Sequence, residues 1–134
     1  MNNYLETQIN KLIDYINNNQ LGLGWKNHPN RNFQGTYITG EVFDYVIFTK
    51  TKKLVFDAKE TEKDVLHLQS KDIKQIVNLM KCYNTGIEAF LLIYFSTYNK
   101  LMRCDVKNVL NILSSRKHIK QSDCDIFDYK EIIK

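Results

Sequence analysis

The sequence predicts an α/β fold in which a mixed central sheet is flanked by helices. Three observations support this fold class. Ala89–Phe95 is a continuous apolar run, as expected for a strand that is covered on both faces. Tyr4–Asn19 places apolar residues at the spacing of an amphipathic helix. Residues 42–60 hold two apolar segments on either side of a polar, basic stretch, which is the pattern of a β-hairpin.

The segments around the hairpin complete the expected element order, α-β-β-β-α-β-β-α with a short terminal helix or arm. Leu21–Gly40 is poorly periodic and contains four of the five glycines and the only proline. We expect either an irregular first strand, with Trp25 and Phe33 packed inward, or a DNA-facing loop whose aromatic residues stack on bases. After the hairpin, Thr61–Leu68 is expected to be a loop.

A second helix is expected from about Lys71 to Tyr83, with Ser70 as its N-cap. Asn84-Thr85-Gly86 would end this helix, because glycine suits a left-handed C-terminal cap. The core face of the helix is expected to hold Ile73, Ile76, Val77 and Met80. The last three elements are expected to be a strand, a helix capped by Asp105, and a terminal helix or arm, at Leu101–Cys104, Val106–Leu113 and Asp125–Ile133.

Length and composition indicate one globular domain covering residues 1–134. Hydrophobic residues make up 43% of the chain and charged residues 25%, as in ordinary globular proteins. No apolar run approaches the roughly 20 residues that cross a bilayer, and MNNYLETQ lacks a signal-peptide core. We therefore expect a cytoplasmic protein without a membrane partner. Its three cysteines are far apart in sequence, so we expect reduced thiols and no zinc site.

The charge balance is compatible with a nucleic-acid partner. The formal net charge is +4 and the sequence pI is about 8.9. Two groups of basic residues are candidates for contacts with phosphate. A basic run is also commonly just a solvated chain end or turn, and the sequence leaves both interpretations open. The candidates are Lys50, Lys52 and Lys53 in the hairpin turn and Arg116, Lys117 and Lys120 near the C-terminus.

Three charged residues lie within the hairpin. Asp57 and Lys59 are two residues apart on one expected strand, so their side chains point to the same face. Asp44 lies on the preceding strand at a spacing that allows the two carboxylates to converge. A carboxylate pair beside a lysine suits a divalent metal that activates water next to a phosphate, and oxygen ligands favour Mg²⁺ or Mn²⁺. The alternative is a surface salt bridge between Lys59 and either aspartate.

The order Asp44, then Asp57-Ala58-Lys59, resembles the PD-(D/E)xK nuclease signature. More narrowly, FDAKET at 56–61, KQIVNLM at 74–80 and AFLLIYFST at 89–97 resemble RecU-type Holliday junction resolvases. Members of that family carry an F-E-A-K-E-T strand, a helix that opens with H-Q-I, and a strand of the type F-L-L-I-x-F-S. RKHI at 116–119 and DIFDYK at 125–130 are similar to the family's C-terminal stretch. The resemblance implies a single nuclease domain with the restriction-endonuclease-like fold.

The resemblance also implies roles for individual residues. Asp44 and Asp57 would hold Mg²⁺, with Mn²⁺ as a substitute, and Lys59 would orient water and stabilise developing charge. Gln75 occupies the glutamine position of H-Q-I and would assist the metal site, although an exposed glutamine is the alternative. Glu6 is a further candidate ligand, because the first helix of this nuclease class often lends a glutamate. Its default place is the solvated face of that helix.

Two departures from the family pattern concern the metal. Val42 stands where RecU-type enzymes have a threonine ligand, so one contact would come from water, a backbone carbonyl or Glu60. Asp57 replaces the family's glutamate with a shorter side chain.

The implied function is a Mg²⁺-dependent endonuclease that resolves Holliday junctions in DNA recombination and repair, of the small kind that phages and mobile elements encode. Two symmetric cuts in a four-way junction favour a homodimer. Only fourteen residues, Asn30–Phe43, separate Pro29 from Asp44, fewer than in the longer resolvases, whose extra residues include a protruding segment. The alternatives are a less selective DNase of the same superfamily, of repair or restriction type, and a non-catalytic DNA-binding module of this fold.

Overall fold

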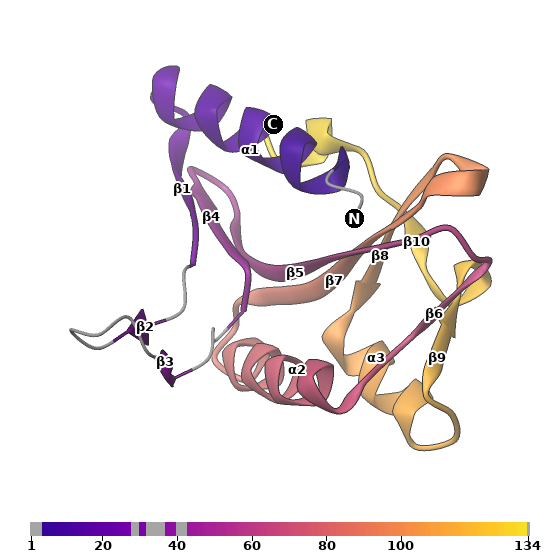
Figure 1. The fold of residues 1–134 in the computed structure, drawn as a ribbon. Coiled ribbons are helices and arrows are strands. Elements are labelled where there is room, and N and C mark those ends of the chain that lie inside the picture. Colours follow the sequence, from indigo (N-terminus) through magenta and orange to yellow (C-terminus); the bar gives the residue numbers. More distant parts are fainter. Residues whose placement is uncertain (1–3, 28–29, 32–36, 40–42, 134) are drawn as a thin grey trace.

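The computed structural model describes residues 4–27, 30–31, 37–39 and 43–133 (Figure 1). Three α-helices, ten strands and three 3-10 turns lie within these ranges. In chain order they are α1 Tyr4–Asn18, β1 Gly22–Lys26, β2 Asn30–Arg31, β3 Tyr37–Thr39, β4 Tyr45–Thr49, β5 Lys53–Thr61, β6 Val65–His67, α2 Ser70–Tyr83, β7 Glu88–Phe95, η1 Ser96–Tyr98, β8 Lys100–Asp105, α3 Val106–Leu113, β9 His118–Lys120, η2 Gln121–Asp123, β10 Asp125–Ile126 and η3 Tyr129–Glu131.

Six strands form a mixed central sheet in the order β1-β4-β5-β7-β8-β10. The pairing of β5 with β7 is parallel, and the other neighbouring strands are antiparallel. Helix α1 covers one face of this sheet, and α2 and α3 lie on the other face (Figure 1). The expected mixed sheet flanked by helices is therefore confirmed.

Alternation along the strands divides the core into two clusters, one on each face of the sheet. Leu54 and Phe56 of β5 pack on the α1 face, where Ile9 and Ile16 of the helix are fully buried. Val55 lies between them in sequence and belongs to the cluster under α2 and α3. β7 is buried on both faces, because helices cover both sides of the sheet at this strand.

The hairpin strands differ in length, and this difference exposes one edge of β5. Tyr45, the first residue of β4, pairs with Phe56. β5 continues beyond that pair to Thr61, and its residues from Asp57 onward pair only with β7. The polar end of β5 therefore runs past the end of β4 while it stays fixed to the centre of the sheet.

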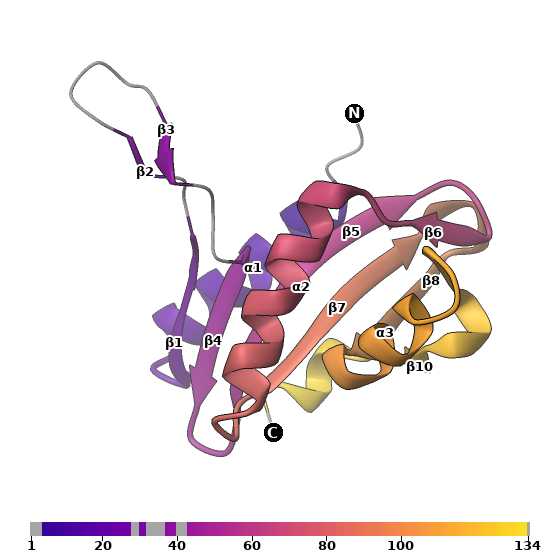
Figure 2. The same ribbon diagram turned by 90° about the horizontal axis from the view of Figure 1, so that it is seen from below.

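Two small ribbons accompany the sheet. β6 pairs with β9, with His67 opposite His118, so part of the segment expected to be a loop forms a strand. β2 pairs with β3, and Figure 2 shows this ribbon projecting away from the sheet. None of the helices in the described part of the chain is long and apolar enough to cross a membrane.

The predicted helices and the central strand are confirmed, with corrections in detail. The N-cap of α2 is Gln69 and not Ser70, because the helix begins one residue earlier than expected. Val77 is 44% exposed, whereas Leu79 is fully buried on the core face. Gly86 has a φ of 94°, as expected for a left-handed cap. The terminal segment forms β10 and a 3-10 turn in place of a helix.

The prediction that Trp25 packs inward is wrong. Its side chain is 39% exposed and contacts the ring of Phe48 edge-on, with a centroid distance of 5.7 Å. Phe33 and Val42 lie outside the described residues. Asp105 stands at the N-cap of α3, but its carboxylate accepts a hydrogen bond from Arg103 instead of capping the helix.

The three cysteines are free thiols, as predicted. The register of β8 and β10 pairs Arg103 with Asp125, which places Cys104 across from Cys124. A hydrogen bond from Cys124 lowers the pKa of the buried Cys104 thiol. Two cysteines that are far apart in sequence are therefore neighbours in the fold.

Candidate active site

The two hairpin aspartates meet at the open end of the hairpin, where β4 begins. Because Tyr45 pairs with Phe56, the residues next to this pair, Asp44 and Asp57, stand opposite each other. The Asp44 amide donates a hydrogen bond to Oδ1 of Asp57 at 2.7 Å. In return, the Ala58 amide donates to Oδ2 of Asp44 at 3.0 Å. The backbone of each strand therefore holds the carboxylate of the other.

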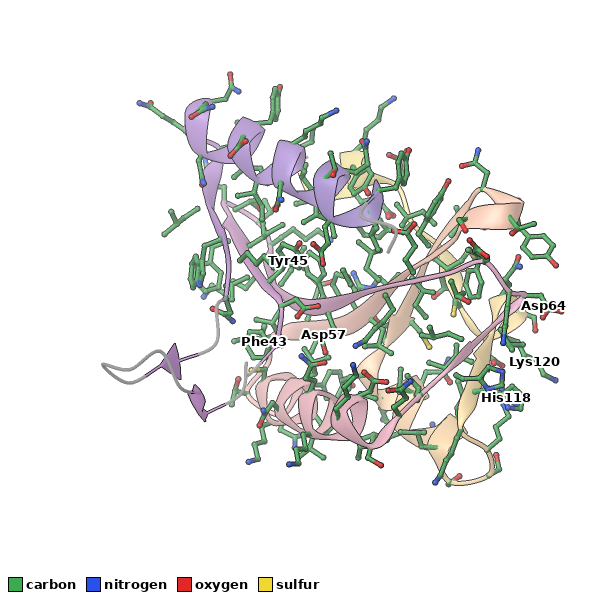
Figure 3. All side chains as sticks on the ribbon, in the orientation of Figure 1. Phe43, Tyr45, Asp57, Asp64, His118 and Lys120 are labelled. Atoms are coloured by element: carbon green, nitrogen blue, oxygen red, sulfur yellow. The ribbon has the colours of Figure 1, made fainter. Side chains whose placement is uncertain are left out.

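Asp57 is fully buried, which is unusual for a carboxylate. Figure 3 shows it between the sheet and α2. Its second oxygen, Oδ2, has no hydrogen-bond partner among the described residues. Burial, and then the charge of Asp44, raises the pKa of Asp57 to about 7, against the lowering effects of Lys59 and the Asp44 amide. A buried carboxylate oxygen without a donor is an expected place for a cation.

Lys59 lies on the same face of β5 as Asp57, as the spacing predicts, but it is not paired with either hairpin aspartate. Its Nζ is 2.7 Å from Oδ1 of Asp72 and 3.3 Å from Oε1 of Gln75. Both partners belong to α2. The side chain of Lys59 is 20% exposed, so the ammonium is held at the boundary between the core and solvent.

Asp72 is a member of this cluster that the sequence analysis did not single out. It is buried and lies in the first turn of α2, where its Oδ2 accepts a hydrogen bond from the Gln69 amide at 2.7 Å. Its spacing from Gln75 in the sequence could have identified Asp72. Asp72 precedes Gln75 by three residues, so the two side chains share one face of the helix. A carboxylate beside the predicted glutamine was a candidate partner for Lys59.

Gln75 is half-buried and turned toward the site, which excludes the alternative of an exposed glutamine. Its amide oxygen accepts from Lys59 in this structure. Ligation of a metal by the same oxygen would therefore compete with the Lys59 contact.

The two glutamates near the site lie on the side of α1. Glu6 is an exposed residue of α1 with its Oε2 3.4 Å from Nζ of Lys26. Glu60 follows Lys59 on β5 and therefore points to the opposite face. Its Oε1 accepts a hydrogen bond from the Leu5 amide at 3.0 Å, so it binds the N-terminus of α1. A pocket of about 360 Å³ at this edge is lined by both glutamates together with Lys59 and Asp72.

A family model for recombination protein U, RecU, matches residues 2–133. The chain belongs to the RecU family. No curated protein matches the sequence.

Among solved structures, the RecU-family chain is similar to Hjc, a Holliday junction resolvase from Archaeoglobus fulgidus. The TM-score is 0.56 at 12% sequence identity, over 90% of this chain and 94% of that chain. This likeness shows that the two proteins share the restriction-endonuclease-like fold. D212, a nuclease from a fusselovirus, aligns with a TM-score of 0.49 at 14% identity, over 96% of this chain and 86% of that one.

The donor set of the RecU-family site fits a hard divalent cation. In the described part of the chain, no three histidine, cysteine, aspartate or glutamate side chains converge closely enough to hold a metal. The protein therefore offers the two carboxylates of Asp44 and Asp57, including the unpartnered Oδ2 of Asp57. Mg²⁺ is commonly held by one or two carboxylates, with water and substrate phosphates completing its octahedron.

The six predicted DNA-binding residues do not join the acidic centre. Lys50, Lys52 and Lys53 lie at the closed turn, where Lys52 is 3.9 Å from a carboxylate oxygen of Glu88. Lys117 and Lys120 belong to or adjoin β9, and Figure 3 places Lys120 well away from Asp57.

Arg116 has a structural partner. Its guanidinium contacts Oδ2 of Asp123 at 2.5 Å and donates to the carbonyl oxygen of His118. Arg116 therefore fixes the loop around β9, and its guanidinium already has two acceptors within the protein.

Proposed function

We propose that this chain cleaves four-way DNA junctions with Mg²⁺ held by Asp44 and Asp57, that Lys59 assists at the scissile phosphate, and that two copies act together. As a member of the RecU family, the chain is a Holliday junction-resolving endonuclease, and resolvases of this family depend on a metal. The identity of the metal, the roles of the residues and the dimer are our proposals. The observation that supports them best is the buried, unpartnered Oδ2 of Asp57 opposite Asp44.

Each residue of the site has a distinct task. A bound Mg²⁺ supplies positive charge that polarises the phosphate and acidifies the attacking water, and Mn²⁺ is expected to substitute for it. The Asp44 amide fixes Asp57, and the Ala58 amide fixes Asp44, so both carboxylates are oriented before any cation arrives. Lys59 presents an N–H bond and a positive charge to the phosphate oxygens, where negative charge increases in the transition state.

The roles of Gln75 and Glu6 are secondary in this proposal. Gln75 orients Lys59 through its amide oxygen, and a metal bound to the same oxygen would compete with this contact. Glu6 remains a candidate for an outer contact because it lines the same pocket as Lys59. Gln75→Met, which replaces the amide with a thioether of similar length, is expected to weaken cleavage less than loss of Asp57.

Recognition of branched DNA is expected to depend on shape and phosphate contacts. The six basic residues lie on both sides of the acidic centre, at the hairpin turn and near β9, so arms that leave a junction in different directions would meet separate clusters. The ribbon β2–β3 projects from the body, which gives the chain a short protrusion despite its shortened segment (Figure 2). Two-fold related cuts require two such sites, which supports a homodimer.

The test compares a synthetic four-way junction with linear duplex of the same sequence, each with and without Mg²⁺. We expect paired nicks in the junction only with metal, and a dimer in sedimentation. Equal cleavage of both DNAs by a monomer would instead identify a general DNase. Metal-independent binding without any cleavage would identify a non-catalytic module.

A further inference from the structure

Asp72 and Asp57 are the two buried charged residues in the described part of the chain. Both carboxylates lie on the α2 face of β5, with Lys59 beside them. We propose that Asp72 is a positioning residue that holds Lys59 away from Asp57 and leaves Asp57 available to the metal. This inference rests on the proposed function, because it concerns the lysine and the ligand assigned there.

The contacts of Asp72 fix its carboxylate from two directions. Oδ1 is 2.7 Å from Nζ of Lys59 on β5, and Oδ2 is 2.7 Å from the amide of Gln69. Asp72 is also in the first turn of α2, where the helix dipole favours a negative charge. One group therefore ties the end of the helix to the lysine of the sheet.

Gln75 gives the ammonium of Lys59 a second fixed direction. It lies one helical turn after Asp72, and its Oε1 is 3.3 Å from the same Nζ. An ammonium has three N–H bonds, and two acceptors on α2 take two of them. The third N–H is left for a phosphate oxygen or a water molecule, so the two α2 residues determine which way the lysine can act.

Charge competition explains why the partner needs to be a carboxylate. The charge of Lys59 already lowers the pKa of Asp57, so the two groups interact although they form no ion pair. If Asp72 lost its charge, Asp57 would remain as an acceptor on the same face. Lys59 would then turn toward the oxygen that we assign to the metal, and the cation would have to displace an ammonium.

The experiment measures Mg²⁺ binding by calorimetry and single-turnover cleavage of a four-way junction at saturating protein. Asp72→Asn keeps an oxygen for the Gln69 amide but removes the charge that holds Lys59. We expect metal affinity to fall about 10-fold and the cleavage rate about 10- to 100-fold. Asp72→Glu retains the charge and an acid that suits the first turn, so it should recover part of both losses.

A double-mutant cycle separates positioning from structure. In a Lys59→Ala background, Asp72→Asn should lower neither metal affinity nor rate further, because the lysine it acts on is gone. Asp64→Asn controls for the loss of one negative charge, since Asp64 is exposed and lies far from Asp57 (Figure 3). Lys74→Gly, at an exposed position of α2, controls for a weakened helix. Both controls should keep the wild-type rate.

Three results would overturn the inference. Asp72→Asn could keep the wild-type rate and metal affinity while Lys59→Ala is impaired. Asp72→Asn could lower the rate and metal affinity by the same factors in the Lys59→Ala background as in the wild-type protein. The losses of rate and metal affinity in Asp72→Asn could also equal those in Lys74→Gly when the two variants have the same melting temperature. A Lys59→Ala protein with full activity would instead remove the lysine from the proposed function, and a wild-type protein without Mg²⁺ binding would remove the metal site.

Discussion

The two ends of the β4–β5 hairpin carry charged residues in opposite physical states. At the closed end, Lys50 and Lys53 are exposed, and Lys52 is only 3.9 Å from Glu88 in a solvated pair. At the open end, Asp57 is fully buried and Lys59 is engaged by two acceptors of α2. Lys53 and Lys59, six residues apart on β5, are therefore in different environments.

The difference arises from what covers each end. β5 extends past Tyr45, and the N-terminal turns of α2 bring Asp72 and Gln75 against this extension. Asp57 and Asp72 are buried there, so their charges are costly unless they have partners. At the turn, solvent screens the charges, and an exposed ion pair contributes roughly 0–1 kcal/mol. A charged residue within a strand sequence therefore indicates a candidate site where the tertiary structure buries it.

The largest expected effect is at the buried end. Asp57→Asn should lower the single-turnover rate by about 1000-fold or more, because the proposed ligand of the metal loses its charge and metal assistance is worth several kcal/mol. DNA binding should stay nearly intact, since a negative charge close to phosphate is removed. The measurement is cleavage of a labelled junction together with its binding in Ca²⁺.

Asp44→Asn should behave in the same way, with its amide still able to hold Asp57. Asp64→Asn, at an exposed position, is the matched control and should cleave normally. Wild-type cleavage in Mg²⁺ by either hairpin variant would remove that aspartate from the site.

Lys59→Ala should lower the rate by about 100- to 1000-fold, because a positioned charge acts mainly in the transition state. Its affinity for Mg²⁺ should not fall, since a nearby positive charge is removed. Lys107→Ala, at an exposed position of α3, is the control for the loss of one positive charge. If Lys59 were only an ion-pair partner, the variant would keep its turnover and lose some melting temperature, which the two measurements together would reveal.

The buried carboxylate should also make the metal-free protein less stable as pH rises. The pKa of Asp57 is raised from 3.8 to about 7 by burial, so between these values the folded state binds more protons than the unfolded state. Stability is therefore greatest below pH 4 for this group and declines as pH rises through 7. The full effect is roughly 4 kcal/mol at most.

Chemical denaturation at pH 5 and pH 8, in the presence of a chelator, measures this decline. Asp57→Asn carries no titrating group and should flatten it, so the inactive variant should be the more stable protein at pH 8. If the stability of the wild-type protein changes with pH in the same way as that of Asp57→Asn, then Asp57 does not titrate in this range.

The smallest effect is expected at the solvated end. Neutralising Lys50, Lys52 and Lys53 together should reduce the slope of log affinity against log salt by about 0.9 for each phosphate that the variant no longer neutralises. Cleavage at saturating protein should change little. Neutralising Arg116, Lys117 and Lys120 together tests the second cluster. The melting temperature of this variant is recorded as well, because Arg116 holds Asp123. If a triple variant keeps the wild-type salt slope, its three residues do not belong to the DNA interface.

Much of the fold could be predicted because local patterns agree with it. The apolar spacing of α1, the continuous run of β7 and the positive φ at Gly86 follow from periodicity and turn chemistry. The pairing of Asp44 with Asp57 could also be anticipated, since register within a hairpin follows from its turn.

Contacts between distant segments could not be predicted in this way. Trp25 has an apolar side chain in a strand, but β1 is an edge strand and leaves the ring exposed. β6 pairs with β9 across more than 50 residues, a pairing that neither segment specifies alone. The meeting of Cys104 with Cys124 also depends on the position of β10 along β8.

The same distinction between local patterns and distant contacts applies to the residues of the site. By itself the sequence determined that Asp44, Asp57 and Lys59 share one hairpin, because alternation and register are local properties of strands. Only the tertiary structure decided that Asp57 is buried without a partner for one oxygen, and that Lys59 turns to Asp72. Burial and ion pairing depend on how α2 packs on the end of β5, and that packing is fixed by the whole core.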